Sequence, residues 1–363
     1  MSCYYFHRKF LINLASCLFV AAIIIAPAVA DSGKFQELIH QARESRGATE
    51  LSKLAASMKP GQWAELKARR PADLMEVFAG YRDSGREAWY HIAGWTDDGQ
   101  WDTKTGQFFY MGFRRQFKFI SFSDKDNAWT VIPGPFGWHT PGKGALQDDR
   151  TTTFGHAYGG NALDIVGGKF YRAMAGYTYV YDIADQSWDR FPGGNMMSIE
   201  FFPGLGLLSH SSKPHRKGFY KLELFDEKNK KWIDFTELPF SAHHALARYN
   251  YLLDEILIIA GNDSRTVVKI DPDGTVTRLK DLPFDMTIRH GKLVVEPNTG
   301  KYLIFNLGKL FEFSSTENEY REVPDFKDPW DKYEMPVPAT IPEYGVIMFV
   351  DKKTLLYKHA SDR

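Results

Sequence analysis

The chain has 363 residues, and its 45 Lys and Arg side chains balance 45 Asp and Glu side chains. It contains no basic cluster and no Arg-rich tail, which argues against nucleic acid as a partner. Its two cysteines, Cys3 and Cys17, both lie in the first thirty residues, so the rest of the chain has no disulfide, no thiolate metal site and no thiol nucleophile. The aromatic content of 15% suits β-strands and sugar-stacking surfaces equally.

Residues 1–30 have the pattern of a signal peptide. Arg8 and Lys9 precede the apolar run LINLASCLFVAAIIIA, and Ala28-Val29-Ala30 forms a small-residue cleavage site. We therefore expect a periplasmic or secreted protein that is free of the membrane after cleavage. A single spanning helix is one alternative, for which the apolar run is short. A lipoprotein anchored at Cys17 is another, although the apolar run continues past that residue.

Two helical patterns follow, in an N-terminal segment that we bound at residues 31–59. The first has an apolar face formed by Phe35, Leu38, Ile39 and Ala42. The second has Thr49 as a candidate N-cap and an apolar face formed by Leu51, Leu54, Ala55 and Met58. We expect these helices to cover or brace the domain that follows them. A helix that binds a partner is the alternative.

One pattern then recurs along residues 60–363. Each copy is a strand of alternating apolar residues, a polar turn and a second short strand closed by proline. The copies are FKFISFSDKDNAWTVIP, YTYVYDIADQSWDRFP, FYKLELFDEKNKKWIDFTELP, TVVKIDPDGTVTRLKDLP and KLFEFSSTENEYREVP.

The spacing of these copies is regular. The last-strand positions Trp188, Trp232, Val276 and Tyr320 are each 44 residues apart, and Trp129 precedes Trp188 by 59. Two further strands precede the copies, such as HALARYN and EILIIAG before the fourth. Four strands in about 44 residues are typical of one blade of a β-propeller.

The same residues carry a resemblance to the kelch repeat. One strand ends in Gly (Gly112, Gly176, Gly261, Gly308), the next runs to an Asp (Asp124, Asp182, Asp226, Asp271), and a Trp follows in the last strand. The chain is in this respect similar to propellers of the galactose-oxidase-like group, with one glycine in place of two and with Val276 and Tyr320 in place of Trp. The copper-radical chemistry of that group needs a Tyr cross-linked to Cys, which this chain lacks after residue 30.

The number of blades follows from where the pattern stops. The next last-strand position would be 364, one beyond the last residue, and strands near GVIMFVD and TLLYKH lack a fourth partner. An open ring would leave an unpaired edge, so we expect the strand at Trp63 to supply it, with residues 85–94 as the second choice. The prediction is an all-β, six-bladed, kelch-like propeller, closed by an N-terminal strand and monomeric.

Candidate site residues fall where the blades begin. In a propeller the first strand of each blade lines the central channel, and the segments before these strands contain His156, Tyr158, Asn161, His243, His244, Arg289 and His290. Imidazoles exchange protons near neutral pH, and Arg binds carboxylates. A water-filled channel with structural histidines is the alternative.

A long Gly- and Pro-rich loop, residues 134–150, explains the 59-residue spacing. Loops of this length are often functional, and Trp138, His139 and Lys143 give it a stacking surface and two cationic donors. Trp138 as a plug on the propeller face is the alternative. The same ambiguity holds for Trp101.

These residues favour an exported protein that binds an acidic carbohydrate at the channel mouth. If it is an enzyme, lyase chemistry on a uronate fits: Arg289 would neutralise the carboxylate, His244 or His290 would take the proton, and Tyr158 would protonate the leaving oxygen. A non-catalytic glycan- or protein-binding module and a sugar mutarotase or epimerase are the alternatives. We expect no cofactor. A metal bound by His156, His290 and one of His243 and His244 is a weaker possibility, because adjacent residues on a strand face opposite sides.

Overall fold

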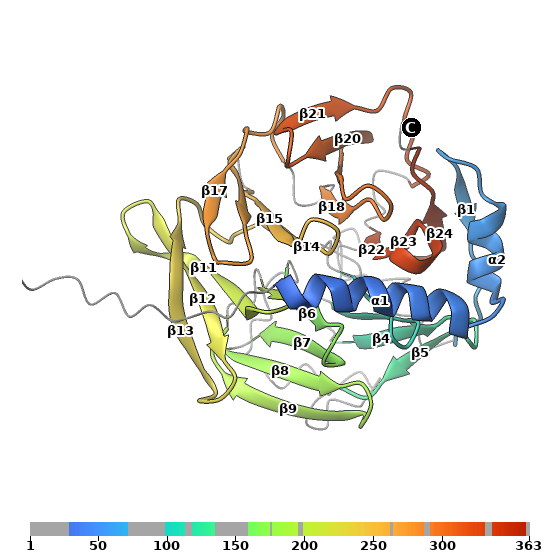
Figure 1. The fold of residues 1–363 in the computed structure, drawn as a ribbon, viewed down its shortest axis with the longest axis horizontal. Helices are drawn as coiled ribbons and strands as arrows, with labels where there is room; N and C mark the ends of the chain where they lie inside the picture. The colour runs from blue at the N-terminus through green and yellow to red at the C-terminus, as the bar shows by residue number, and fades with distance from the viewer. Residues whose placement is uncertain are drawn as a thin grey trace, which may run out of the picture.

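The computed structural model describes residues 29–71, 99–112, 118–134, 159–174, 176–194, 199–261, 264–286, 291–330 and 336–360. Within these ranges, twenty-four strands form six antiparallel sheets of four strands each. Figure 1 shows the sheets arranged around a common centre. The predicted all-β, six-bladed propeller is therefore confirmed.

The first three blades follow one another along the chain. Blade 1 consists of β2 (Gln100–Asp102), β3 (Gln107–Gly112), β4 (Lys118–Ser123) and β5 (Ala128–Ile132). Blade 2 consists of β6 (Asn161–Asp164), β7 (Lys169–Met174), β8 (Tyr177–Asp182) and β9 (Ser187–Pro192). Blade 3 consists of β10 (Ile199–Phe202), β11 (Gly206–Arg216), β12 (Phe219–Asp226) and β13 (Lys231–Leu238).

The other three blades complete the ring. Blade 4 consists of β14 (Leu246–Asn250), β15 (Glu255–Ile259), β16 (Val267–Ile270) and β17 (Val276–Arg278). Blade 5 consists of β18 (Lys292–Val295), β19 (Tyr302–Asn306), β20 (Lys309–Ser314) and β21 (Glu319–Glu322). Blade 6 consists of β22 (Val337–Ile341), β23 (Val346–Val350), β24 (Thr354–Tyr357) and β1 (Trp63–Glu65). The first strand of each blade contacts the first strand of the next, and β22 contacts β2, so these six inner strands form a closed ring.

The repeated pattern has a local cause in the turn before each outer strand. The residue two positions before the last-strand Trp, Val or Tyr has a left-handed backbone in five blades: Asn127, Gln186, Lys230, Gly274 and Asn318. The Asp that ends the preceding strand accepts hydrogen bonds from turn amides, as Asp182 does from Ala184 at 3.0 Å. Such side-chain bonds hold a tight turn in place. The sequence pattern therefore encodes the same hairpin five times.

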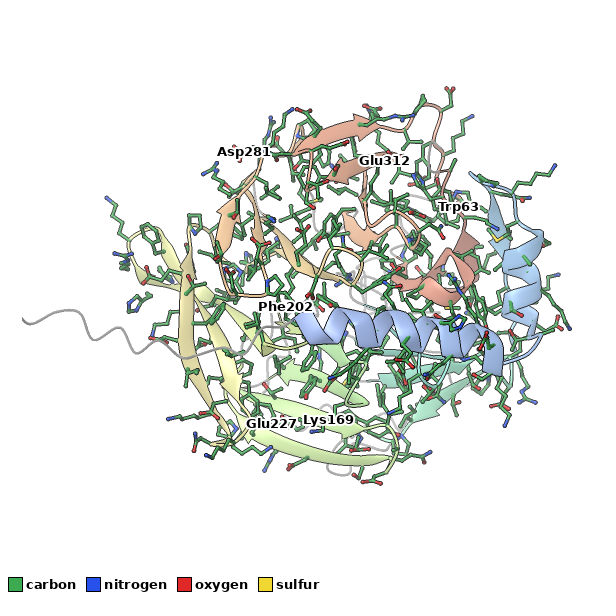
Figure 2. The ribbon with its side chains drawn as sticks, in the orientation of Figure 1. Trp63, Lys169, Phe202, Glu227, Asp281 and Glu312 are labelled. Atoms are coloured by element: carbon green, nitrogen blue, oxygen red, sulfur yellow. The ribbon has the colours of Figure 1, made fainter. Side chains whose placement is uncertain are left out.

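The N-terminal strand closes the ring as predicted. β1 pairs with β24, with Trp63 opposite Tyr357, and the indole of Trp63 stacks on the Tyr357 ring at a centroid distance of 4.6 Å. It also meets Trp330 edge-on at 5.2 Å. Figure 2 labels Trp63 at the edge of the ring. The second-choice segment, residues 85–94, lies outside the described residues.

The core lies between the blades. Aromatic and aliphatic side chains from adjacent sheets form shared clusters, such as Phe109 and Phe119 of blade 1 with Phe170 and Tyr181 of blade 2. Burying each such side chain is worth about 1.5–3 kcal/mol. Each blade therefore depends on its neighbours, and the ring provides a rigid frame for the strand ends at its centre.

In the described part of the chain, two helices precede the strand that closes the ring. α1 (Val29–Ser45) and α2 (Glu50–Ser57) carry the predicted apolar faces, with Phe35, Ile39, Leu51 and Ala55 all buried. Thr49 caps α2 as expected, through reciprocal hydrogen bonds with Ser52. Among the helices that the structure describes, none is long and apolar enough to span a membrane. The predicted signal peptide falls almost entirely on residues 1–28, outside the described ranges.

α1 covers one face of the ring, where it crosses in front of the blades in Figure 1. Phe35 contacts Tyr251, in the turn after β14, at a ring distance of 4.7 Å. Arg43 donates to the carbonyl of Glu343 at 2.9 Å, in the short helix η2 (Pro342–Tyr344) between β22 and β23. The expectation that a helix covers the ring is confirmed. We call this face proximal and the opposite face distal.

Candidate functional site at the distal end of the inner strands

The direction of the inner strands places the predicted site on the distal face. The turns that follow β14 and β22 contact α1, so these strands begin at the opposite side. Asn161, His243 and His244 begin or precede inner strands and therefore lie at the distal face. The other predicted residues lie outside the described part of the chain: Tyr158, His156, Arg289, His290, Trp138, His139 and Lys143.

Asn161 is fully buried at the start of β6. Its side-chain oxygen accepts a hydrogen bond from Arg172 Nη1 at 3.4 Å, and its backbone carbonyl accepts one from Gln100 Nε2 at 3.2 Å. Asn161 thus connects blade 1 with blade 2 and accepts a hydrogen bond from a guanidinium of its own blade. Its role in substrate binding stays a prediction.

The arrangement of His243 and His244 differs from the prediction. We expected them on a strand, facing opposite sides, but they lie in a turn before β14. Their rings stack on each other, with centroids 3.9 Å apart and planes inclined by 24°. The cause is local: Ser241 Oγ accepts a hydrogen bond from the His243 amide at 3.0 Å, a side-chain turn that delays the start of the strand.

The backbone of His244 lies against Gly261, which follows the end of β15. His244 has φ of +68°, a left-handed conformation that is uncommon for residues other than glycine, although Asn, Asp and His adopt it more often than the rest. A Cβ atom at Gly261 would lie 2.2 Å from the His244 carbonyl oxygen. Only glycine permits this close approach of the two segments, so Gly261, one of the strand-ending glycines of the repeat, positions the histidine pair.

Three buried cationic side chains that the sequence analysis missed lie on the two innermost strands of their blades. Arg172 on β7 is 2% exposed and Lys292, the first residue of β18, is 1% exposed. Arg248 on β14 has a side chain 12% exposed and lies 3.8 Å from Glu200 of β10. A signal was available, because each of these charges stands among mainly apolar or aromatic residues of its strand. Without the ring, however, nothing showed that they share its centre.

Carboxylates of the inner strands are segregated to the other end. Asp102 and Asp164 end β2 and β6 at the proximal face, where Asp164 accepts a hydrogen bond from the Gly167 amide at 2.7 Å. Burial raises the pKa of both carboxyls above their ordinary value. These acids hold turns together. The distal half of the inner strands keeps Glu200 as its one carboxylate among the described residues, 3.8 Å from Arg248.

The buried His210 links β11 of blade 3 to the segment that leads into the turn of His243 and His244. His210 on β11 is 1% exposed, and its Nε2 lies 2.8 Å from the Phe240 carbonyl. Burial lowers the pKa of His210 to about 4, so the ring is neutral near pH 7 and Nε2 donates the hydrogen bond. Sequence reasoning did not single out this residue, because the charge and polarity of a lone histidine do not reveal its burial.

Trp101 is structural, which settles its predicted ambiguity. It is 5% exposed, and its indole nitrogen donates to Glu343 Oε1 at 2.8 Å. Glu343 also accepts from Thr103 at 3.1 Å and pairs with Arg46 beyond the end of α1. This buried group fastens α1 to the proximal face.

A groove of about 210 Å³ lies between blades 2 and 3, far from the histidine turn. Its lining includes Phe191, Phe225, Lys169 and Glu227, and the last two pair at 2.9 Å. Figure 2 labels these two residues near each other. Strand directions place this pair at the proximal face. Since these charges already neutralise each other, we retain the distal end as the candidate site.

The described part of the distal end offers guanidinium, ammonium, imidazole and one carboxylate. This set can bind an anion and exchange protons with it. Among the described residues no group of three or more His, Cys, Asp or Glu side chains is arranged to hold a metal. His156 and His290, which the metal hypothesis needs, lie outside them.

Comparison with known proteins supports the fold. No family model and no curated protein matches the chain. The match to a chain of the mitotic checkpoint complex covers 83% of this chain and 92% of that one, with 9% identity and a TM-score of 0.50. The match to a structural-genomics protein from Bacteroides thetaiotaomicron covers 82% of this chain and 75% of that one, with 12% identity and a TM-score of 0.47. The match to an oligogalacturonate lyase in complex with manganese covers 84% of this chain and 99% of that one, with 11% identity and a TM-score of 0.42. At these identities the likeness concerns the fold alone.

Proposed function

We propose that this propeller is an exported protein that binds an acidic carbohydrate at the distal end of its inner strands. The observation that supports the proposal is the presence of three largely buried cations on the first two strands of three blades: Arg172, Arg248 and Lys292. Guanidinium and ammonium groups attract carboxylates, and arginine binds them in two-pronged geometry. A carboxylate can approach them from the distal face, because α1 covers the proximal one.

A uronate suits this site better than a neutral sugar. Arg248 can pair with a carboxylate in two-pronged geometry while Lys292 supplies a second positive charge. A neutral sugar offers no carboxylate to either cation. The aromatic side chains of the distal surface can contact the apolar face of a sugar ring.

The proposed reaction is β-elimination from a uronate chain. His244 takes the proton from the carbon next to the carboxylate, the bond between the neighbouring carbon and the glycosidic oxygen breaks, and a carbon–carbon double bond forms. Tyr158 returns a proton to the leaving oxygen. Arg248, with Arg289, stabilises the negative charge that develops on the carboxylate. Atoms balance without any added reagent.

Ultraviolet absorbance of the unsaturated uronate tests this reaction. Purified protein is incubated with polygalacturonate, alginate and a neutral glucan, and we expect absorbance to rise with a uronate polymer alone. His244→Ala and Arg248→Met should each reduce the rate at least about a hundredfold. Arg278→Met is the matched control, since Arg278 lies in the same blade but on its outer strand, with a side chain 59% exposed.

The outcomes separate the candidate functions. Turnover that survives His244→Ala and Arg248→Met would place the reaction elsewhere. Binding without turnover would favour the non-catalytic module. Anomer exchange of a free acidic sugar, followed by NMR, would instead identify a mutarotase.

A further inference from the structure

Blade 3 carries a hairpin that extends beyond the rest of the ring. β11 has 11 residues and β12 has 8, whereas the corresponding strands of the other blades have 4 to 6. The pairing is irregular on either side of Pro214, and Gly218 turns the chain with φ of +77°. Figure 1 shows this blade, in yellow, reaching past the outline of the others. Because β11 leads away from the proximal face, the tip lies on the distal face.

The tip is strongly basic. Lys213, His215, Arg216 and Lys217 are all exposed, as is every residue from 213 to 219. Glu237 pairs with Arg216 at 2.5 Å and lies 3.6 Å from His215. In the part of the chain that the structure describes, no carboxylate pairs with Lys213 or Lys217. The tip therefore keeps an excess of positive charge at neutral pH.

An exposed aromatic ring stands within this charge. Phe219 is 39% exposed, and the guanidinium of Arg216 lies over its ring at 4.4 Å. The neighbouring blade repeats the arrangement: Tyr177, also the first residue of a third strand, is 38% exposed with Arg190 over it at 4.8 Å. Both pairs lie on the distal face. An arginine over an aromatic ring leaves the opposite side of that ring available for stacking.

The hairpin is continuous with the candidate site. Ser211 accepts a hydrogen bond from the Ala242 amide at 3.1 Å, and the Ser212 carbonyl accepts one from Ser241 Oγ at 3.2 Å. Residues 241 and 242 lead directly into His243 and His244. Hydrogen bonds therefore connect the base of the hairpin directly to the turn that carries the histidine pair.

We infer that this basic hairpin binds the chain of an acidic polysaccharide where it continues outward from the distal site. Lys213, Arg216 and Lys217 would pair with successive carboxylates, and Phe219 would stack on a sugar ring. The inference rests on the proposed function for its choice of ligand. It adds that polymers, and not single uronate units, are the preferred ligands.

Affinity electrophoresis in gels containing polygalacturonate or a neutral glucan tests the inference. The variant Lys213→Ser/Arg216→Ser/Lys217→Ser should bind polygalacturonate roughly tenfold more weakly, since exposed ion pairs contribute a few-fold each. The control Lys228→Ser/Lys230→Ser/Lys231→Ser removes as many charges from the same blade at its proximal end, and its affinity should change less than about twofold. Phe219→Ser should weaken binding without altering the charge.

Equal weakening by the two triple variants would overturn the inference, because it would show an effect of net charge alone. So would wild-type protein that binds neither polymer, or that binds anionic phosphatidylglycerol vesicles and not polygalacturonate. The proposed chemistry fails separately. If no uronate is turned over but the hairpin variant still loses polymer affinity, the hairpin binds polymer and the lyase proposal is wrong. If turnover occurs and the hairpin variant keeps the wild-type KM for polymer, the lyase proposal holds and the inference about the hairpin is wrong.

Discussion

The imidazole of His210 makes the stability of the ring depend on pH. Burial lowers its pKa to about 4, against an ordinary value of 6.5. Below pH 6.5 the unfolded chain therefore binds a proton that the folded chain does not. The folded state therefore keeps its full free energy of unfolding, as far as His210 is concerned, above pH 6.5, and it loses part of this free energy progressively as the pH falls toward 4. The difference between the two pKa values corresponds to about 3 kcal/mol.

We expect the free energy of unfolding of the wild type to fall by about 3 kcal/mol more than that of His210→Gln between pH 7 and pH 4. Glutamine can still donate to the Phe240 carbonyl but does not titrate. Urea unfolding at a series of pH values measures this slope. His215→Gln, on the same strand with a side chain 47% exposed, should keep the wild-type slope, and equal slopes for all three proteins would contradict the account.

Single residues also mark the limit of sequence reasoning at the site. The histidine pair could be found from its place before an inner strand, but its stacking depends on Ser241 and Gly261, which act through space and through a turn. Arg172 could not be recognised as a site residue from the sequence for a related reason. It stands on the second strand of its blade, and its partner Asn161 is opposite it only once the hairpin has formed.

Among the elements, the outer hairpins were the most predictable. Their alternating strands, turn residues and aromatic residues are all local in sequence, so each hairpin can be predicted from its own segment alone. The cap of α2 by Thr49 is equally local. What α1 covers was not predictable, because its face pairs with turns about 200 to 300 residues away, such as those at Tyr251 and Glu343.

α1 is held on the ring by a buried ion pair as well as by apolar contact. Arg46, just past the end of α1, pairs with Glu343, whose side chain is fully buried. Burial raises the pKa of Glu343, and Arg46 opposes that shift. Removing Arg46 would leave the carboxylate buried without its cation, a change that costs about 3–5 kcal/mol in comparable pairs.

Arg46→Ala should therefore loosen α1, with faster amide hydrogen exchange in α1 and earlier tryptic cleavage at Lys34 and Arg43. Arg46→Ala/Glu343→Gln should recover part of the lost protection, since a neutral amide tolerates burial better than a charge. Lys53→Ala is the control, because it removes an ion pair with Glu50 whose two side chains are 59% and 62% exposed. Unchanged exchange in Arg46→Ala would show that apolar packing alone holds the helix.

For the whole molecule, the decisive element is the three-residue strand β1. It completes blade 6 by covering the edge of β24, so that each of the six described sheets has four strands. An uncovered edge pairs readily with another chain. Closure was predictable because the character of an outer strand recurs around Trp63. The aromatic cluster that holds it was not, since Phe326, Trp330 and Phe349 come from segments distant in sequence.

Two matched tryptophans separate the stability of a blade from the closure of the ring. Trp63→Ala and Trp188→Ala each remove a half-buried indole from an outer strand, Trp188 packing on Tyr181 at 5.0 Å and Phe119 at 5.2 Å. Each should lower the free energy of unfolding by about 3 kcal/mol. Only Trp63→Ala should free the edge of β24, because β9 is joined to β8 by a short turn whereas β1 and β24 meet from opposite ends of the chain. We therefore expect dimers or larger species in light scattering after size exclusion for Trp63→Ala alone. If both variants stay monomeric and lose the same free energy of unfolding, β1 stabilises its blade but does not prevent association of the ring with other chains.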